Sequence, residues 1–190
     1  MPSKPIKRVS ALASNYTRGP VDSDGKIGVL LQEVPDLNLW QVAAWPDCLA
    51  EIGQKTADAI GVEEAPGPRS NKNQGNQAFL RVEPLKFWVI GASAPQILPS
   101  SGAILDLSHS RTHVRVAGPE AQILLNRYLP LDLREPSFTS GAVASTVFHH
   151  IGVTLWRSPS GFELFLPRSF ALSLWELLCQ GAGQFGYEVT

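Results

Sequence analysis

The stretch that decides the fold is Thr112–Leu129, which reads THVRVAGPEAQILLNRYL. Its first residues alternate apolar and polar side chains, with Val114 and Val116 on one side, and this alternation predicts a strand with one buried face. Gly118 then turns the chain. Pro119 follows at a position where the first turn of a helix tolerates proline, because the missing N–H would have no intrahelical partner there.

The residues after this corner have the spacing of an amphipathic helix. Glu120 places a negative charge against the expected helix N-terminus, and Pro130 ends the helix. The apolar residues between them recur at i, i+3, i+4 and i+7: Ala121, Leu124, Leu125 and Tyr128. A strand, a Gly-Pro corner and an amphipathic helix therefore form one unit, and the rest of the chain repeats or completes it.

The composition limits the classes of protein to consider. The chain has 190 residues, enough for one large domain or two small fused ones. Its net charge is −1 and only 17% of its residues are charged, so we expect no long-range attraction to nucleic acid or to an anionic membrane. The chain contains five Trp and eight Phe, and 44% of its residues are apolar. This exceeds what one core of this size requires and suggests a buried subunit interface.

Cysteine usage and the N-terminus favour a cytoplasmic protein. Cys48 and Cys179 are isolated, without CxxC spacing, and are typical of buried reduced thiols. The first residues lack the apolar run of a signal peptide, and no stretch approaches the ~20 apolar residues of a membrane span.

The N-terminal segment stands apart from the rest of the chain. Met1–Lys26 is polar and mildly basic, and two interpretations are open: a disordered solvated tail, or an arm that becomes ordered against a partner. We expect an arm over residues 1–27 and a single domain over 28–190, made of two halves at about 28–102 and 103–190.

Hydrophobic periodicity and the positions of Gly and Pro place the remaining elements. We expect residues 63–77 to form a flexible loop, and 79–82 with 86–90 to form a hairpin at the edge of a sheet. The further expected strands are 28–34, 39–44, 103–108, 142–149, 153–157, 162–166 and 185–189, and the further helices are 46–60 and 169–180. Both halves then have a βαββ order, which predicts an α+β fold of antiparallel sheets with helices packed on them.

The helix Ser169–Gln180 carries two apolar stripes. Leu174 and Leu178 lie on one of them, whereas Leu172 and Trp175 lie on another. A helix that is apolar on two sides is covered on two sides. We therefore expect a partner, or the other half of the chain, to cover the second stripe.

The sequence is poor in catalytic motifs. His109 and His113 would lie about 13 Å apart along a strand, too far to share a zinc ion, and His149 and His150 would point to opposite faces. We found no GxSxG turn for a nucleophile and no GxGxxG motif for a dinucleotide. The sequence therefore predicts no catalytic, cofactor or metal site on this chain.

Four blocks in the second half of the chain resemble a known family. They are DLSHSRT (106–112), AGPEAQILLNRYLPLDL (117–133), SGAVASTVFHHIGVTLWR (140–157) and FELFLPRSFALSLWELL (162–178). Together they resemble the gamma subunits of heterotetrameric sarcosine oxidases, which are similar to the N-terminal part of folate-dependent aminomethyltransferases. The resemblance implies a folate-binding-domain-like fold.

The resemblance also implies partners and cofactors. Alpha, beta and delta subunits would complete a complex that oxidatively demethylates sarcosine to glycine, with FAD, FMN, NAD and tetrahydrofolate all held by those other subunits. This chain would then be a non-catalytic subunit that stabilises the complex. We expect its partner interface to include Leu172, Trp175, Arg168, His149 and Trp156.

One departure from the aminomethyltransferase pattern concerns folate. The hairpin of those enzymes carries a Gly-Gly-x-x-Asp-Asp segment, whereas Ile151–Trp156 reads IGVTLW here. Leu155 and Trp156 take the approximate acidic positions, and neither can accept a hydrogen bond from a pterin N–H. We expect the folate site to be lost, and we expect Glu163, the remaining acidic residue of this region, to face solvent.

Three other functions remain open at this point. One is the equivalent subunit of an N-methylglutamate dehydrogenase-type complex. The second is a stand-alone folate-dependent protein for one-carbon transfer, and the third is an interaction module of an unrelated complex.

Overall fold

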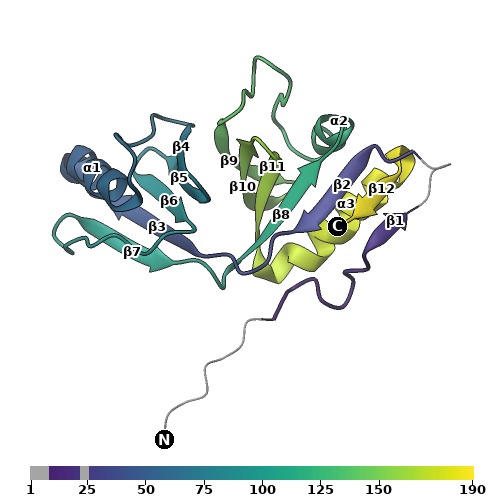
Figure 1. Cartoon of the computed structure of the whole chain (residues 1–190), viewed down its shortest axis with the longest axis horizontal. Coiled ribbons are helices and arrows are strands. Elements are labelled where there is room, and N and C mark those ends of the chain that lie inside the picture. Colours follow the sequence, from purple (N-terminus) through teal and green to yellow (C-terminus); the bar gives the residue numbers. More distant parts are fainter. Residues whose placement is uncertain (1–8, 22–25) are drawn as a thin grey trace, which may run out of the picture.

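The protein is an α+β structure with two sheets side by side (Figure 1). The computed structural model describes residues 9–21 and 26–190. The predicted fold class is confirmed: both sheets are largely antiparallel, and helices pack on their outer faces.

The smaller sheet has five strands and carries helix α1. Its strand order is β4-β5-β6-β3-β7. Helix α1 (Leu49–Ile60) follows a single 3-10 turn that begins at Pro46, and Gly61 ends it in the left-handed conformation with φ 82°, as glycine at this position permits. The strands are β3 (Leu39–Ala44), β4 (Asn71–Gln74), β5 (Gln77–Glu83), β6 (Lys86–Ile90) and β7 (Gly102–Asp106).

The larger sheet has seven strands in the order β1-β12-β2-β8-β11-β10-β9. Strands β12 and β2 run parallel, whereas the other neighbouring pairs among the described residues are antiparallel. The strands are β1 (Gly19–Val21), β2 (Val29–Glu33), β8 (Arg111–Ala117), β9 (Val143–Phe148), β10 (Ile151–Ser158), β11 (Gly161–Pro167) and β12 (Tyr187–Val189).

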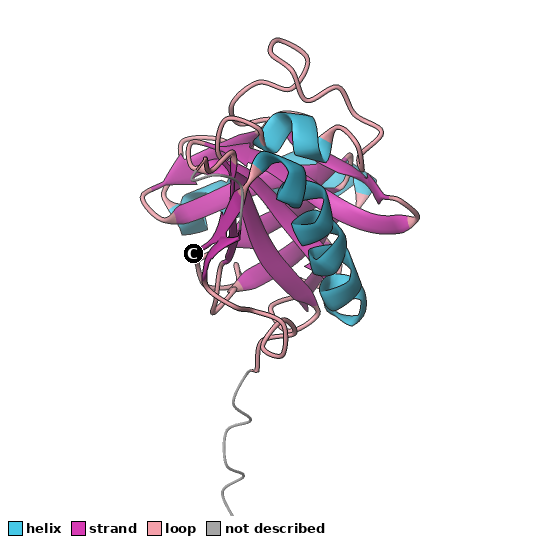
Figure 2. Ribbon diagram, turned by 90° about the vertical axis from the view of Figure 1, so that its right-hand side faces the viewer, coloured by secondary structure: helices cyan, strands magenta, loops and turns pink. Residues whose placement is uncertain are grey.

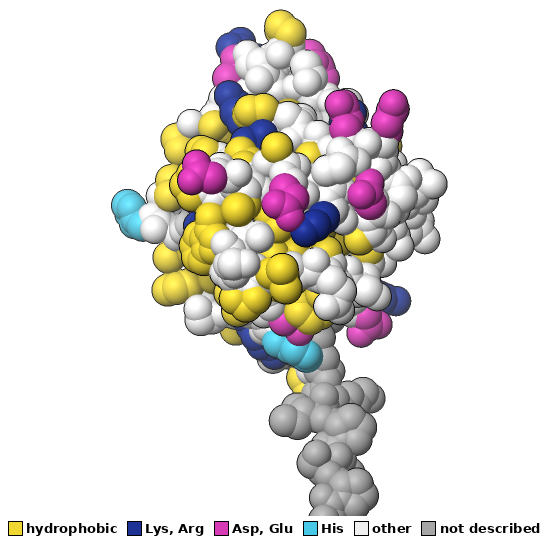
Figure 3. Space-filling view, turned by 90° about the vertical axis from the view of Figure 1, so that its left-hand side faces the viewer, with side chains coloured by type: hydrophobic (Ala, Val, Ile, Leu, Met, Phe, Trp, Pro, Cys, Tyr) yellow, Lys and Arg dark blue, Asp and Glu magenta, His cyan; other side chains and the backbone are white. Residues whose placement is uncertain are grey.

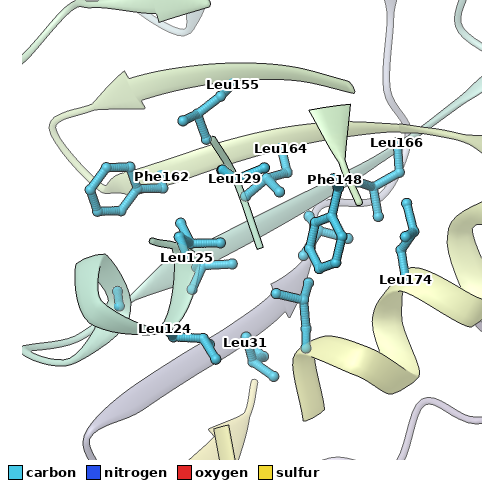
Figure 4. Packing of buried hydrophobic residues seen from close by; sticks show 14 of the residues in the cluster. Leu31, Leu124, Leu125, Leu129, Phe148, Leu155, Phe162, Leu164, Leu166 and Leu174 are labelled. Carbon is cyan, nitrogen blue, oxygen red and sulfur yellow. The ribbon is translucent and has the colours of Figure 1, made fainter. Parts of the chain in front are cut away.

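Two helices cover the outer face of the larger sheet (Figure 2). Helix α3 (Ala171–Ala182) follows a 3-10 turn at Arg168–Phe170, and α2 (Ala121–Leu125) follows β8. Figure 4 shows apolar side chains of the helices and strands meeting in one cluster. Members with no exposed surface include Leu31, Leu124, Leu125, Leu155, Leu164 and Leu166.

A second apolar cluster joins the inner faces of the two sheets. Leu39, Leu80 and Trp88 of the smaller sheet pack with Val143, Trp156 and Phe165 of the larger one. The two sheets therefore bury apolar surface against each other as well as against their helices.

The stretch 112–129 forms the predicted unit with a shorter helix. Gly118 has φ 100° and turns the chain after β8, and α2 begins after Glu120. The regular helix ends at Leu125, and turns continue to Leu129. The predicted apolar face is confirmed, since Ala121, Leu124 and Leu125 are buried.

Two sequence-based expectations about the smaller sheet were wrong. Residues 63–77 do not form only a loop, because Asn71–Gln74 pairs with β5 as an edge strand. The hairpin β5–β6 is consequently internal rather than at an edge. Strand β2 pairs with β8 and β12 of the larger sheet, so strand pairing does not follow the predicted halves 28–102 and 103–190. Hydrophobic periodicity does not detect a strand such as β4, because a strand at the edge of a sheet needs no buried face and can be polar throughout.

The described part of the predicted arm packs on its own chain. Leu12 is fully buried, and the ring of Tyr16 stacks on Trp175 at 5.3 Å between ring centroids. Strand β1 extends the larger sheet through β12. Neither a solvated tail nor an arm held only by a partner describes residues 9–21. The parts of the predicted arm at 1–8 and 22–25 lie outside the described residues.

Candidate functional site

A row of polar side chains crosses the inner face of the larger sheet. Residues directly opposite one another on neighbouring strands point to the same side, and the register pairs Trp156 with Glu163, Glu163 with Arg115, and Arg115 with Gln32. His113 precedes Arg115 by two residues on β8 and shares its face. Strand alternation therefore gathers four polar residues and one indole toward the smaller sheet.

Glu163 is the centre of this row. Only 1% of its surface is exposed. Its Oε2 lies 2.7 Å from His113 Nε2, and its Oε1 accepts hydrogen bonds from Arg115 Nε at 2.8 Å and from Ser158 Oγ at 2.7 Å. Arg115 also donates from Nη1 to Gln32 Oε1 at 3.1 Å. The expectation that Glu163 faces solvent was wrong, because strand β11 is central and this face meets the second sheet.

The surroundings keep the Glu163 carboxylate ionised. Burial by itself raises the pKa of Glu163, but the hydrogen bonds and charge of His113, together with the bonds from Ser158 and Arg115, outweigh burial and hold the pKa below its ordinary value. A carboxylate with three donors and a lowered pKa is a weak base. It is suited to fixing the orientation of His113 and Arg115 rather than to taking up a proton.

The polar row borders a cavity between the sheets. The cavity has a volume of about 480 Å³, within the range of small-molecule sites. His113, Arg115, Ser158 and Glu163 line it on one side. The turn Val34–Asn38, the β4–β5 turn and the Ser158–Ser160 turn supply much of the rest.

Trp156 contributes an unusual group to the cavity wall. It is 9% exposed, and its buried indole Nε1 has no hydrogen-bond partner among the described residues. Native proteins rarely leave a buried donor unpaired. Trp156 is therefore an exception beside the cavity that it lines.

An aromatic stack supports the same wall from inside. The His113 imidazole lies parallel to the Phe165 ring at 4.5 Å between centroids, and Trp88 meets Phe165 edge-on at 5.5 Å. With Glu163 fixing one ring nitrogen and Phe165 fixing the ring plane, His113 has little freedom to reorient.

A protein metal site needs several His, Cys, Asp or Glu side chains close together. Within 9–21 and 26–190, no three His, Cys, Asp or Glu side chains gather in a way that could hold a metal ion. Cys48 and Cys179 are free and partly buried. Burial raises the pKa of the Cys179 thiol, which lowers its reactivity.

The residues of the predicted partner interface occupy different environments. Trp175 is 1% exposed because Tyr16 covers it, and Trp156 lies between the sheets. Both are therefore largely buried within the chain itself, and their place at a partner interface stays a prediction. The chain's own N-terminal segment covers the second stripe of α3 at Trp175, whereas Leu172 of the same stripe is partly exposed.

Three members of that predicted interface are accessible. Leu172 and Arg168 are partly exposed, and Arg168 donates to the carbonyl of Val9. His149 is exposed with φ 54° in the β9–β10 turn. Their role at an interface stays a prediction.

Apolar side chains also gather on the far end of the smaller sheet. Figure 3 shows this face of the molecule. Trp45, Leu98 and Leu105 lie on or next to α1 and β7 and are 48%, 64% and 55% exposed. None of the helices in the described part of the chain has the length and apolar character needed to span a bilayer.

Comparison with known proteins identifies relatives of the whole fold. No protein-family model matches the chain. Sarcosine oxidase subunit gamma of Corynebacterium sp. (strain U-96) is 27% identical over 153 residues, which cover 76% of this chain and 74% of the relative. Sarcosine oxidase subunit gamma of Arthrobacter sp. is 25% identical over 149 residues, covering 75% of this chain and 73% of the relative.

Solved structures share the architecture. A chain of the heterotetrameric sarcosine oxidase from Corynebacterium sp. U-96 superposes with a TM-score of 0.75 at 22% identity, covering 94% of this chain and 96% of that one. Aminomethyltransferase T of the glycine cleavage system from Bartonella henselae gives a TM-score of 0.66 at 14% identity, covering 94% of this chain and 57% of that one. In sequence and in fold, the chain is thus related to the gamma subunits of heterotetrameric sarcosine oxidase.

Proposed function

We propose that this chain is the gamma subunit of a heterotetrameric sarcosine oxidase. The observation that carries the proposal is the coverage of the match. The shared fold extends over 94% of this chain and 96% of a chain of the Corynebacterium complex, and named gamma subunits match three quarters of the sequence. A match of this extent includes both sheets and their helices.

The role proposed for the chain is structural. Among the described residues, the polar centre at Glu163 is an ion-pair network, and the carboxylate that accepts from Ser158 is a weak base because its pKa is lowered. In this proposal the reaction takes place on partner subunits, which we call alpha, beta and delta, and FAD, FMN, NAD and tetrahydrofolate are bound there. The gamma chain stabilises their assembly. That the complex works in the cytoplasm stays a prediction.

The fold itself gives reason to expect binding partners. Trp45, Leu98 and Leu105 expose apolar surface at one end of the molecule, and such surface is typical of contacts with other subunits. The tight packing of α1, α2 and α3 on their sheets leaves these side chains without a role in the chain's own core.

Co-expression tests the proposal directly. The chain is produced with the three other subunits encoded in the same genome, and the purified assembly is weighed by native mass spectrometry. We expect one copy of the 20.6 kDa chain per complex, and a complex without it that assembles poorly and oxidises sarcosine more slowly. A stable monomer that never co-purifies with the flavoprotein subunits would contradict the proposal.

One substitution tests the predicted interface on α3. Leu172→Glu places a charge on the partly exposed stripe, and we expect it to reduce co-purification of the complex because a buried unpaired charge weakens an interface. Ser173→Glu, at the neighbouring exposed position of the same helix, is the matched control. Equal recovery of the complex with both variants would remove Leu172 from the interface.

A further inference from the structure

Strand β7, at the edge of the smaller sheet, has a neighbouring strand on one side only. The Leu107 N–H donates to the Leu39 carbonyl beside β3 at 2.9 Å. Alternate residues of an antiparallel pair turn their N–H and C=O groups toward the neighbour, so Leu105 faces β3 in the same way. Ile104 and Asp106 consequently direct their N–H and C=O groups away from the sheet.

The other three edge strands in the described part of the chain carry features that limit pairing with other chains. Strand β1 has three residues and includes Pro20, which has no N–H to donate. Strand β4 is polar throughout and includes Lys72. At the start of β9, the Val143 N–H already donates to the Arg69 carbonyl at 2.9 Å. Short length, proline, lysine and covering segments are the usual ways in which sheet edges avoid other chains.

Strand β7 has none of these features. Its sequence, GAILD, contains no Pro, Lys or Arg, and its register with β3 runs through all five residues. Its one charged residue, Asp106, is the last. Leu105 is 55% exposed, and Ala103 on the same face is also exposed. A regular, apolar edge of this kind suits an added strand from another chain.

An exposed aromatic side chain lies beyond the first residue of β7. Trp45 is 48% exposed, and its indole Nε1 donates to the Pro99 carbonyl at 3.0 Å, which fixes the plane of the ring. Its backbone N–H donates to the Ser101 carbonyl at 3.0 Å, and the Leu98 carbonyl accepts from the Ser101 N–H at 2.9 Å. A ring that is fixed in advance loses little further entropy when a partner covers it.

The charges beside β7 indicate the chemistry of the partner. Asp106 is exposed at one end of the strand. Asp47 is exposed near the other end, three residues after Ala44, which pairs with Gly102. Within the described residues neither carboxylate forms an ion pair with Lys or Arg, whereas the lysine of α1 and that of β6 are each paired with a glutamate. Figure 3 shows acidic side chains among the apolar ones on this face. A segment with Lys or Arg at both ends therefore complements this edge.

A second copy of this chain fits the edge less well. If two copies paired antiparallel through β7 around a two-fold axis, Ile104 would lie opposite its own counterpart and Asp106 opposite Gly102 of the other copy. Asp106 would then approach Asp47 of the other copy, and like charges brought together across an interface repel. The charges favour a different chain as the occupant.

We propose that β7 is a docking edge, at which an extended segment of a companion subunit pairs as a further strand of the smaller sheet. The segment has apolar side chains that cover Leu105 and Trp45, and Lys or Arg at both ends, close to Asp47 and Asp106. The inference rests on the proposed function for the identity of the companion.

Hydrogen–deuterium exchange with single-residue resolution tests the proposal on the co-purified complex and on the chain alone. An added strand pairs with the outward backbone groups, so we expect the N–H groups of Ile104 and Asp106 to exchange at least about tenfold more slowly in the complex. The Leu105 N–H, which faces β3, measures any general stabilisation and should slow less.

Variants of one position separate the backbone from the side chain. Ile104→Pro removes an outward N–H and obstructs an added strand, while the hydrogen bonds to β3 remain. We expect it to reduce recovery of the complex by at least about tenfold, and Ile104→Val, the matched control, to leave recovery unchanged. If Ile104→Pro does not fold, Asp106→Lys replaces it. Asp58→Lys, which reverses an exposed charge on α1, is then the control.

Each contrary outcome is distinct from failure of the proposed function. A chain that enters the complex while the Ile104 and Asp106 N–H groups exchange as fast as in the free chain overturns the docking edge alone. Slow exchange in the free chain that becomes fast on dilution assigns β7 to a second copy and also overturns it.

A chain that does not enter the complex contradicts the proposed function, and a peptide then decides about β7. The probe is a synthetic peptide of alternating Val and Thr with Lys at both ends, added to the 15N-labelled chain. We expect it to shift the Ile104 and Asp106 amide signals saturably, and the same peptide with Glu at both ends to bind at least about tenfold more weakly. Absence of a saturable shift at millimolar peptide, or equal binding of the two peptides, overturns the docking edge.

Discussion

At the scale of single residues, Glu163 is the buried charge on which the polar row between the two sheets depends. Its carboxylate is 1% exposed and holds His113, Arg115 and Ser158. Burying a carboxylate costs free energy of desolvation, and the hydrogen bonds and ion pairs from these partners offset that cost. Removing the carboxylate also leaves those partners without their acceptor.

We expect Glu163→Gln to lower the free energy of unfolding by about 2–4 kcal/mol. The amide turns one acceptor into a donor that faces other donors, and the substitution keeps the side-chain volume. Urea denaturation followed by circular dichroism measures the change. Asp132→Asn removes an exposed carboxylate from the ion pair with Arg134 and should change stability little. Equal effects of the two variants would mean that the Glu163 network contributes no more than a surface pair.

The same carboxylate predicts a dependence on pH. The pKa of Glu163 lies below its ordinary value of 4.5 in the folded chain, so its contribution is fully present above the unfolded pKa and disappears as the pH falls through the folded pKa. We expect the stability difference between the native chain and Glu163→Gln to shrink as the pH falls below about 4.5. Denaturation curves of both proteins at each pH measure this difference, and the effects of the other carboxylates cancel because both proteins contain them. A difference that grew as the pH fell below about 4.5 would have the wrong sign for this mechanism.

At the scale of elements, the corner between β8 and α2 depends on Gly118. Its φ is 100°, and a Cβ there would lie 2.6 Å from the Gly28 carbonyl oxygen and 3.2 Å from Val29 Cα. The corner brings the Glu120 N–H to the same carbonyl at 3.0 Å. Strand β8, the corner and α2 are therefore held against the start of β2 by backbone contacts, and backbone atoms cannot move aside as easily as a side chain can.

We expect Gly118→Ala to destabilise the chain by more than about 1 kcal/mol. Thermal unfolding followed by circular dichroism measures the change. Gly152→Ala is the control, because a Cβ at Gly152 meets nothing within 4 Å, and alanine within a strand should stabilise slightly. Similar melting temperatures for the native chain and Gly118→Ala would show that β2 can move away from the corner.

Elements with one buried face and a clear end were predicted well from the sequence. Hydrophobic periodicity and the positions of proline located β3, α1 and β8 for this reason. Strand β4 was missed, since NKNQ is polar and buries little. Helix α2 was predicted too long because Tyr128, although at helical spacing, lies in a turn where its hydroxyl donates to the Leu177 carbonyl.

The candidate site was harder to predict than the fold. His113, Arg115, Glu163 and Ser158 lie on three strands, up to 50 residues apart for His113 and Glu163, and only the strand register brings them together. Alternation showed that His113 and Arg115 share a face. It could not show that a second sheet would cover that face, which is what buries Glu163.

At the scale of the whole molecule, the N-terminal segment completes the core. Leu12 is fully buried in the cluster of the larger sheet. Tyr16 binds the other end of the chain: its hydroxyl donates to the Thr190 carbonyl at 2.6 Å and accepts from the Glu33 N–H at 2.9 Å. The segment therefore belongs to the domain rather than to a separate arm.

We expect Leu12→Ala to lower the free energy of unfolding by about 2–5 kcal/mol, the usual cost of a leucine-sized cavity. Leu98→Ala, at a residue that is 64% exposed, should cost little. Urea denaturation of both variants measures the difference. A Leu12→Ala variant as stable as Leu98→Ala would mean that the segment packs only loosely in solution.

The position of β12 has a consequence for how the larger sheet closes. Residues Tyr187–Val189 lie between β1 and β2, so a strand from one end of the described chain fills the gap between two strands from the other. Until β12 pairs, β1 lacks its neighbour and one edge of β2 stays open to pairing with other chains. We therefore expect folding intermediates in which β12 is not yet paired to be the forms that associate with one another through this edge.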